Sequence, residues 1–261
     1  STGLDRSRVP RLAIDIGTNG EIVLTDGSSM IAASCAAGPA FEGAHIQCGM
    51  RGASGAIDRV YLRGRTLHYH VIDDVPPRGI CGSGLVDAVA ILRGQGLISS
   101  DGRLAVPQGF ANRALADRLS RQKHVQFFIT DPRKTGLPQQ VAITQRDIRE
   151  LQLAKGAIMA GIQILLDRLK LKEHDIREVY LAGGFGNYIS PDGAVAIGLI
   201  PAFSRAKITQ VGNAAGGGAR MALLSNPDLE HAVRIAEQIE YVELAKHPDF
   251  QKNFVKGMAF P

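Results

Sequence analysis

The chain has 261 residues, 45% hydrophobic and 21% charged, which suffices for a buried core in one large domain or two small ones. Its net charge is +5, but the Lys and Arg residues are scattered and Trp is absent, so the composition argues against a nucleic-acid interface. No apolar run approaches the roughly 18 residues that a membrane helix needs. We therefore expect a cytoplasmic protein that binds neither membrane nor nucleic acid.

Three apolar runs come first in the chain. They predict strands at residues 12–17, 21–24 and 30–36. A Gly-containing turn at residues 17–20 joins the first two runs, and Asp26-Gly27-Ser28 is typical of a hairpin turn. The three runs predict an antiparallel meander with Asp15 at a strand end.

Two less regular segments follow the meander. Residues 38–55 hold five glycines, a density that lets backbone approach backbone or a ligand closely. We expect Glu42 and residues 49–55 beside a ligand cleft or against a partner lobe. This part forms an insertion over residues 38–78, and residues 99–124 form a second, polar excursion.

Helical signals dominate the rest of the chain. Thr144 and Asp147 stand in capping-box positions before an apolar stripe, at spacings of three and four, that reaches Leu169. Shorter elements are predicted as helices at 85–95, at 214–224 and at 229–241, and as strands at 178–182 and 207–211. The order is that of an α/β ribonuclease-H-like lobe of the actin type. Such a lobe has a mixed sheet, a three-strand antiparallel meander and helices on both faces.

The cysteines and histidines form no pattern typical of a metal site or a disulfide framework. Cys35, Cys48 and Cys81 are odd in number and far apart in sequence, which argues against disulfides and against a zinc or iron–sulfur site in this chain. His68 and His70 form an H-x-H and face one side of a predicted strand, but the sequence offers no third ligand nearby.

The turn after the first strand carries the strongest chemical signal. Gly17 and Gly20 permit a tight turn whose backbone N–H groups converge on one anion, and Thr18 and Asn19 add side-chain donors. Asp15, at the strand end, is placed to hold a magnesium ion through water or to orient an attacking water. An ordinary Gly-rich hairpin turn is the alternative reading of the same residues.

Two further segments suggest a ligand-binding surface. Gly183 and Gly184 follow a predicted buried strand, where adjacent glycines let a flat ring lie on the main chain; the alternative is a tight turn. Gln152 and Lys155 share one face of the long helix, away from its main apolar stripe and next to Gly156. For this helical pair, taken alone, a solvated lysine on an exposed face is the stronger reading.

Together these segments resemble one superfamily. The Asp15 loop is similar to a phosphate motif of the actin, Hsp70 and sugar-kinase ATPases, residues 183–187 are similar to their adenosine motif, and the Gln152–Lys155 pair resembles the helix that meets the ribose. A closer resemblance, to the ATPase module of the reductive activators of corrinoid proteins, covers nearly the whole chain. It is carried by the blocks AIDIGTNGE at 13–21, AGPAFEGA at 37–44, GICGSG at 79–84, LQLAKGA at 151–157 and LAGGFGNY at 181–188.

The closer resemblance implies an ATP-dependent enzyme. Such activators couple ATP hydrolysis to the transfer of an electron from their own [2Fe–2S] cluster to a Co(II) corrinoid, which yields the methyl-accepting Co(I) state. Their ATPase has two lobes, each with a phosphate loop, and the cluster lies in a separate N-terminal domain. This chain has one such loop, so we expect residues 1–261 to be the second lobe, without the first lobe or the cluster domain. The implied partner is a corrinoid protein or corrinoid-dependent methyltransferase, and a homodimer is left open.

The resemblance also assigns roles to individual residues, with ATP and Mg²⁺ as cofactors. Asp15 is the expected catalytic residue and the expected ligand of Mg²⁺ through water. The residues expected at the cleft or at a partner contact are Glu42, Gly43, Gly82, Ser83 and Asn213. The expected nucleotide-binding residues are Gly17, Thr18, Asn19, Gly20, Gln152, Lys155, Gly183, Gly184, Phe185, Gly186 and Asn187.

Two other functions stay open at this point: a small-molecule kinase of the same superfamily, which would need a second carboxylate as general base, and a non-catalytic module that only recruits the corrinoid protein. ATP hydrolysis in this superfamily needs both lobes, because donors must meet the transition-state charge from each side of the γ-phosphate. We therefore predict weak nucleotide binding, and neither ATPase nor reductase activity, for this chain by itself. A separation above about 15 Å between Lys155 and Gly184 would exclude Lys155 from the nucleotide site.

Overall fold

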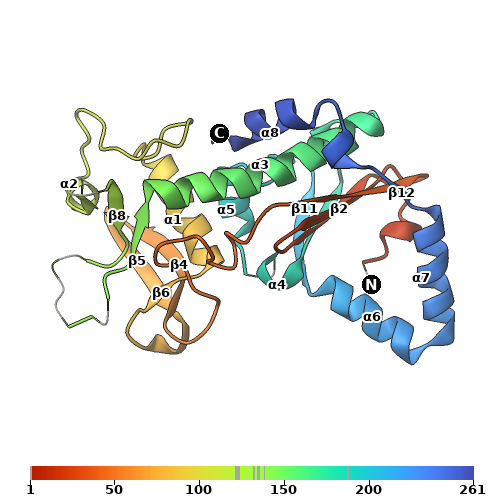
Figure 1. The fold of residues 1–261 in the computed structure, drawn as a ribbon, viewed down its shortest axis with the longest axis horizontal. Helices are drawn as coiled ribbons and strands as arrows, with labels where there is room; N and C mark the ends of the chain where they lie inside the picture. Colours follow the sequence, from red (N-terminus) through yellow and green to blue (C-terminus); the bar gives the residue numbers. More distant parts are fainter. Residues whose placement is uncertain (1, 121–123, 132, 134–135, 138, 187) are drawn as a thin grey trace.

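The computed structural model describes the chain apart from residues 1, 121–123, 132, 134–135, 138 and 187. Its largest sheet has six strands and lies at the right of Figure 1. The strand order is β11 (Lys207–Gly212), β10 (Glu178–Ala182), β1 (Arg11–Ile16), β2 (Gly20–Thr25), β3 (Met30–Cys35) and β12 (Glu240–Tyr241).

The predicted meander is confirmed. β1 pairs antiparallel with β2, and β2 pairs antiparallel with β3. In β1 the residues Leu12, Ile14 and Ile16 are fully buried while their neighbours are half-buried, so the strand alternates as a strand with one core face should. β10 lies parallel to β1, with Asp15 opposite Ala182, and β11 lies parallel to β10. This order is the one expected of a ribonuclease-H-like lobe.

A large insertion separates β3 from the long helix α3 (Gln145–Arg168). The predicted segments 38–78 and 99–124 both fall inside this one insertion, which forms the left half of the molecule in Figure 1. Its strands form two small sheets: β4 (Ala56–Arg63), β5 (Thr66–Val71) and β6 (Gly79–Ile80), and β7 (Leu119–Ser120), β8 (Gln126–Phe128) and β9 (Ala142–Thr144). Its helices are α1 (Gly82–Gly94) and α2 (Arg113–Ala116).

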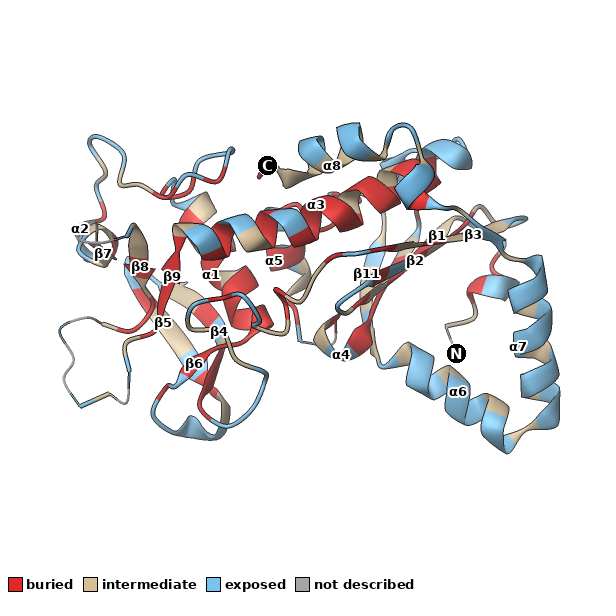
Figure 2. Cartoon of the chain, viewed as in Figure 1, coloured by how far each residue is buried: buried red, intermediate tan, exposed pale blue. Residues whose placement is uncertain are grey.

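Helix α3 connects the two halves of the molecule. It begins at the predicted capping box, in which the Thr144 side chain accepts from the Asp147 backbone N–H and the Asp147 side chain accepts from that of Thr144. From there it runs from the insertion across the sheet (Figure 1). Most of its side chains are buried, as Figure 2 shows, because the core packs on one side and α8 (Phe250–Met258) packs on another.

The remaining helices follow β10 and β11. The bounds are α4 (Gly183–Gly186), α5 (Pro191–Ala196), α6 (Ala214–Leu224) and α7 (Asn226–Gln238), with 3-10 turns at Leu4–Arg6, Ile72–Asp74, Glu173–Asp175 and Leu244–Lys246. The helix predicted at 229–241 begins three residues earlier and ends three residues earlier. It starts early because Ser225 caps it and Pro227 favours its first turn, and it stops early because Glu240–Tyr241 pair with β3. Among the described residues, no helix is both long and apolar enough to cross a membrane.

Candidate functional site

A cavity of about 790 Å³ lies where the insertion meets the six-stranded sheet. Its wall includes four segments that hold the predicted motifs, namely the turn after β1, the segment after β3, the start of α1, and α4, together with further residues of the insertion. Seven of the residues predicted from sequence are in this wall: Gly17, Thr18, Glu42, Gly82, Ser83, Gly184 and Phe185. The structure thus brings most of the predicted motifs to one place.

The turn after β1 exposes only part of the predicted phosphate motif to the cavity. Gly17 N–H donates to the carbonyl of Asn19 at 3.0 Å, and Thr18 Oγ1 donates to Glu42 Oε1 at 2.7 Å. Asn19 is exposed outside the cavity wall, and Gly20 is the buried first residue of β2, where an added Cβ would meet Cys35 and Ile158. Within the loop, therefore, Gly17 and Thr18 are the residues that can meet a ligand in this cavity.

Asp15 lies near the end of β1, as predicted, but it does not line the cavity. Its carboxylate is close to Gly183: a Cβ added at Gly183, which has a φ of +92°, would collide with Asp15 Oδ1 and with the backbone of Ile16. Only glycine readily accepts both this backbone conformation and this proximity. Burial raises the pKa of Asp15. The two predicted motifs, one after β1 and one after β10, are thus in direct contact.

The segment after β10 forms the short helix α4, a helical turn that the sequence did not predict. Gly184 is exposed and lines the cavity, whereas Gly183 and Gly186 are buried. The Phe185 ring stacks on the Phe41 ring, with centroids 4.7 Å apart, and a Cβ added at Gly82 would collide with both residues. Glycine at position 82 therefore lets the sheet side of the cavity pack against α1. Asn187, also predicted here, lies outside the described residues.

Lys155 and Gln152 do not line the cavity. The structure therefore corrects the prediction that they bind the nucleotide there. Both are fully buried, at 0% and 1% exposure. Lys155 Nζ donates to the carbonyls of Gly257 at 2.6 Å and Ala259 at 2.7 Å, and Gln152 Nε2 donates to that of Met258 at 3.0 Å. Burial lowers the pKa of Lys155 to about 8. The end of α8 and the residues after it cover this face of α3, which the helical pattern by itself could not reveal.

Two other predicted residues lie outside the cavity wall. Gly43 has a φ of +81°, and a Cβ there would collide with the backbone of Gly49 and Met50, so its role is a close backbone crossing within the insertion. Asn213 caps α6, its side chain accepting from Gly216 N–H at 2.7 Å. The segment 49–55 was expected beside the cleft, and Arg51 and Gly52 from it do line the cavity.

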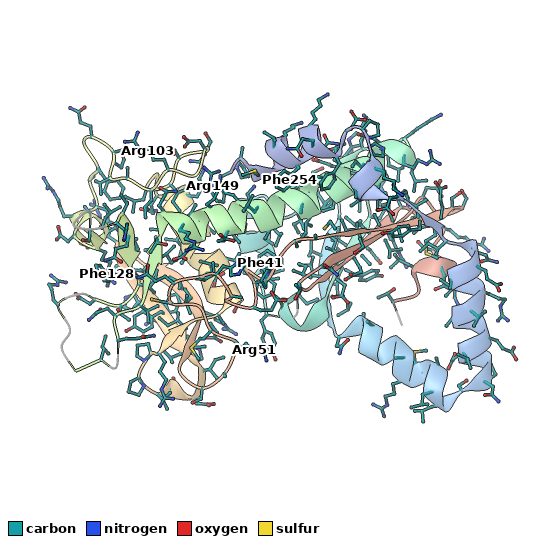
Figure 3. The ribbon with its side chains drawn as sticks, in the orientation of Figure 1. Phe41, Arg51, Arg103, Phe128, Arg149 and Phe254 are labelled. Carbon is teal, nitrogen blue, oxygen red and sulfur yellow. The ribbon has the colours of Figure 1, made fainter. Side chains whose placement is uncertain are left out.

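Sequence reasoning missed the polar side chains on the insertion side of the cavity. Asp58 and His70 both line the cavity, with His70 Nδ1 2.6 Å from Asp58 Oδ1. Arg51, from the expected segment 49–55 and labelled in Figure 3, lines it as well. His68 stacks on Tyr61 and does not line the cavity. The H-x-H pattern drew attention to His70, but its partner lies on the neighbouring strand β4, and only the pairing of the two strands places Asp58 beside it.

Comparison with known proteins gives consistent matches. Residues 10–261 match the family described as the C-terminal domain of RACo, the ASKHA domain. The corrinoid activation enzyme RamQ of Eubacterium limosum is 37% identical over 260 residues, which are 99% of this chain and 44% of that protein. The [Co(II) methylated amine-specific corrinoid protein] reductase of Methanosarcina barkeri is 29% identical over 275 aligned positions, covering 96% of this chain and 46% of that protein.

A solved structure is also similar. The reductive activator for corrinoid,iron-sulfur protein superposes with a TM-score of 0.86 at 36% identity, over 100% of this chain and 41% of that one. The chain therefore spans less than half the length of each of these relatives.

Proposed function

This chain belongs to the family of RACo C-terminal domains, the ASKHA domains, as its motifs predicted, and we propose that it is the ATP-binding lobe of an enzyme that reduces Co(II) corrinoid to Co(I). The relatives support this because they are, by name, a corrinoid activation enzyme, a corrinoid protein reductase and a reductive activator. Because the chain spans less than half of each, the activity is proposed for a protein in which this lobe works with further parts.

One observation carries the nucleotide site: the turn after β1, the start of α1 and the start of α4 open on a single cavity. The tight turn puts the main chain of Gly17 and Thr18 against the cavity. The Thr18 N–H suits a phosphate oxygen there, whereas the Gly17 N–H already donates to the Asn19 carbonyl. Gly82 and Ser83 form the first turn of α1, a helix of 13 residues with no side-chain cap and no acidic residue in its first turn. Its free N–H groups and dipole favour an anion at the same place.

The nucleoside end of the ligand fits the α4 side of the cavity. Gly184 has open space at its Cβ position, so a flat ring can approach the main chain there. The stacked pair Phe41 and Phe185 provides an apolar wall next to it. We place the base and ribose at Gly184 and Phe185 and the phosphates at Gly17, Thr18 and Gly82. Bound Mg²⁺ would neutralise phosphate charge there.

The rest of the reaction is proposed to lie outside this chain. A [2Fe–2S] cluster elsewhere would supply the electron, and a corrinoid protein would receive it. Hydrolysis requires donors on both sides of the γ-phosphate, and this lobe supplies one side. We therefore expect this chain alone to bind ATP weakly and to show no ATPase or reductase activity.

The test is a paired measurement in the complete, cluster-containing protein. Asp15→Ala should fold normally, since no described residue donates a hydrogen bond to the half-buried Asp15 carboxylate. It should still reduce ATP turnover by roughly a hundredfold or more, the scale of one preorganised catalytic group. Co(I) formation should fall in parallel. Full Co(I) formation without ATP turnover would refute the coupling. Phosphorylation of an added small molecule would favour the kinase alternative, and Co(I) formation that needs no nucleotide would favour the recruiting module.

A further inference from the structure

Glu42 presents an unpaired carboxylate oxygen beside the phosphate loop. It lies in the turn after β3, where Thr18 Oγ1 donates to its Oε1 at 2.7 Å and fixes the direction of the side chain. Its other oxygen, Oε2, is buried and has no hydrogen-bond partner among the described residues. Glu42 and Thr18 both line the cavity. Leaving a buried carboxylate oxygen without a donor is unfavourable, so the site favours a ligand that supplies a cation or a water.

We propose that Glu42 receives the hydrated magnesium ion that accompanies the nucleotide, through a water bound to the metal; this inference rests on the proposed ATP site. Thr18 has two roles in this proposal: its backbone contacts the phosphates, and its hydroxyl donates to Glu42 and orients that side chain. Magnesium keeps several of its waters and binds through one or two carboxylates together with substrate phosphates. A single well-oriented carboxylate next to a phosphate loop matches that requirement.

The other carboxylates around the cavity are less suitable. Asp58 already pairs with His70 at 2.6 Å, and Asp73 is exposed at the rim. Asp15 lies against Gly183 and does not line the cavity, so it could serve only as a second carboxylate for the metal, in addition to Glu42. Among the described residues no group of three His, Cys, Asp or Glu could hold a metal by itself. The metal would therefore arrive with the nucleotide, and Glu42 would contact its water shell.

The experiment compares the affinity of ATP with excess Mg²⁺ and with EDTA, from shifts of backbone amide signals of this chain during titration into the millimolar range. In the wild type, Mg²⁺ should tighten ATP binding. In Glu42→Gln the tightening should shrink by about tenfold, the scale of one hydrogen bond to a charged group. Binding of metal-free ATP should be unchanged or tighter, because the substitution removes a negative charge near the phosphates.

A matched control is Glu21→Gln. Glu21 also accepts from a hydroxyl, that of Ser34 at 3.4 Å, but it is exposed on β2 and outside the cavity, so its Mg²⁺ effect should equal that of the wild type. If Glu42→Gln does not fold, Glu42→Asp replaces it, which keeps the charge and withdraws it by one methylene. The Mg²⁺ effect should again shrink, and binding of metal-free ATP should be unchanged.

The outcomes separate this inference from the proposed function. Equal weakening by Glu42→Gln with and without Mg²⁺ would mean that Glu42 only braces the loop, which overturns the inference and leaves the ATP site standing. An unchanged Mg²⁺ effect would overturn it as well. If the wild type binds no ATP under either condition, the proposed ATP site fails and this inference fails with it.

Discussion

The residues predicted to bind the nucleotide lie on two sides of helix α3, and the two sides differ in kind. Figure 3 shows Phe41, in the cavity wall, on one side of α3 and Phe254, in α8, on the other. On the cavity side, glycines place backbone groups around an open space. On the α8 side, Gln152 and Lys155 hold the C-terminal segment: Lys155 Nζ binds two of its carbonyls and lies 5.0 Å from the centre of the Phe260 ring. We call Gln152, Lys155 and residues 257–261 the C-terminal latch.

The difference shows when sequence alone can tell that a motif faces a binding site, and when the answer depends on a segment that packs against the motif. A tight turn that follows a buried strand lies at the edge of the sheet, whatever packs around it. The site at Gly17 and Gly184 could therefore be predicted from sequence alone. The face that a helix buries depends on what packs against it, here a segment about 100 residues further along the chain. Glycine serves that packing too, because a Cβ at Gly156 would press against Met258 and the backbone of Phe254. The predictions below test whether the two sides are separate.

The largest effect on stability is expected at the latch. Lys155→Ala takes their donor from the carbonyls of Gly257 and Ala259 and opens a space beside Phe260, so the free energy of unfolding should fall by about 3 kcal/mol. The affinity for ATP of the variant that remains folded should stay within about twofold of the wild type. Urea unfolding and ATP titration measure the two quantities. A tenfold loss of affinity with normal stability would restore Lys155 to the nucleotide site.

The next effect is expected where the two motifs touch. Gly183→Ala must place a Cβ against Asp15 and Ile16 at a φ of +92°, so we expect a loss of about 2 kcal/mol in the free energy of unfolding, together with weaker ATP binding. Gly184→Ala is the matched control, because no atom of the described residues is found within 4 Å of its added Cβ. Thermal unfolding of both variants makes the comparison. Equal destabilisation by the two substitutions would contradict the contact between Gly183 and Asp15.

A pH-dependent effect should identify the buried charge of the latch. The pKa of Lys155 is lowered to about 8 by burial, from 10.5 in its ordinary state. Between these two pH values the unfolded chain binds one more proton than the folded chain, so this residue makes stability rise with pH, by up to about 1.4 kcal/mol per pH unit. Below pH 8 both states are protonated and the slope vanishes.

The comparison variant for the pH effect is Lys155→Met, which keeps the length of the side chain and cannot titrate. The difference in unfolding free energy between wild type and Lys155→Met, measured by urea unfolding from pH 7 to 10.5, should be flat at first and then grow in favour of the wild type. A difference that stays constant across this range would show that Lys155 keeps its ordinary pKa and is not buried as a charge.

The backbone-based predictions were more successful than the side-chain ones, for a physical reason. The meander, the capping box at Thr144 and the strand before Gly183 depend on local sequence, and the structure has all three. The pairing of Asp58 with His70 and the burial of Lys155 depend on segments that meet only after folding. Asn213 lies outside the cavity wall because its side chain caps α6, a role that the helix predicted after it already allowed.

The central claim is that ATP binds at the junction of the sheet and the insertion, on the cavity side of α3. The most direct measurement is a map of backbone amide shifts of this chain on addition of millimolar Mg²⁺–ATP. We predict that the amides of Gly17, Thr18, Gly82, Ser83 and Gly184 shift together with one dissociation constant, while those of Gly156 and residues 257–260 do not. Shifts confined to the latch, or spread evenly over the surface with no saturation, would contradict the claim.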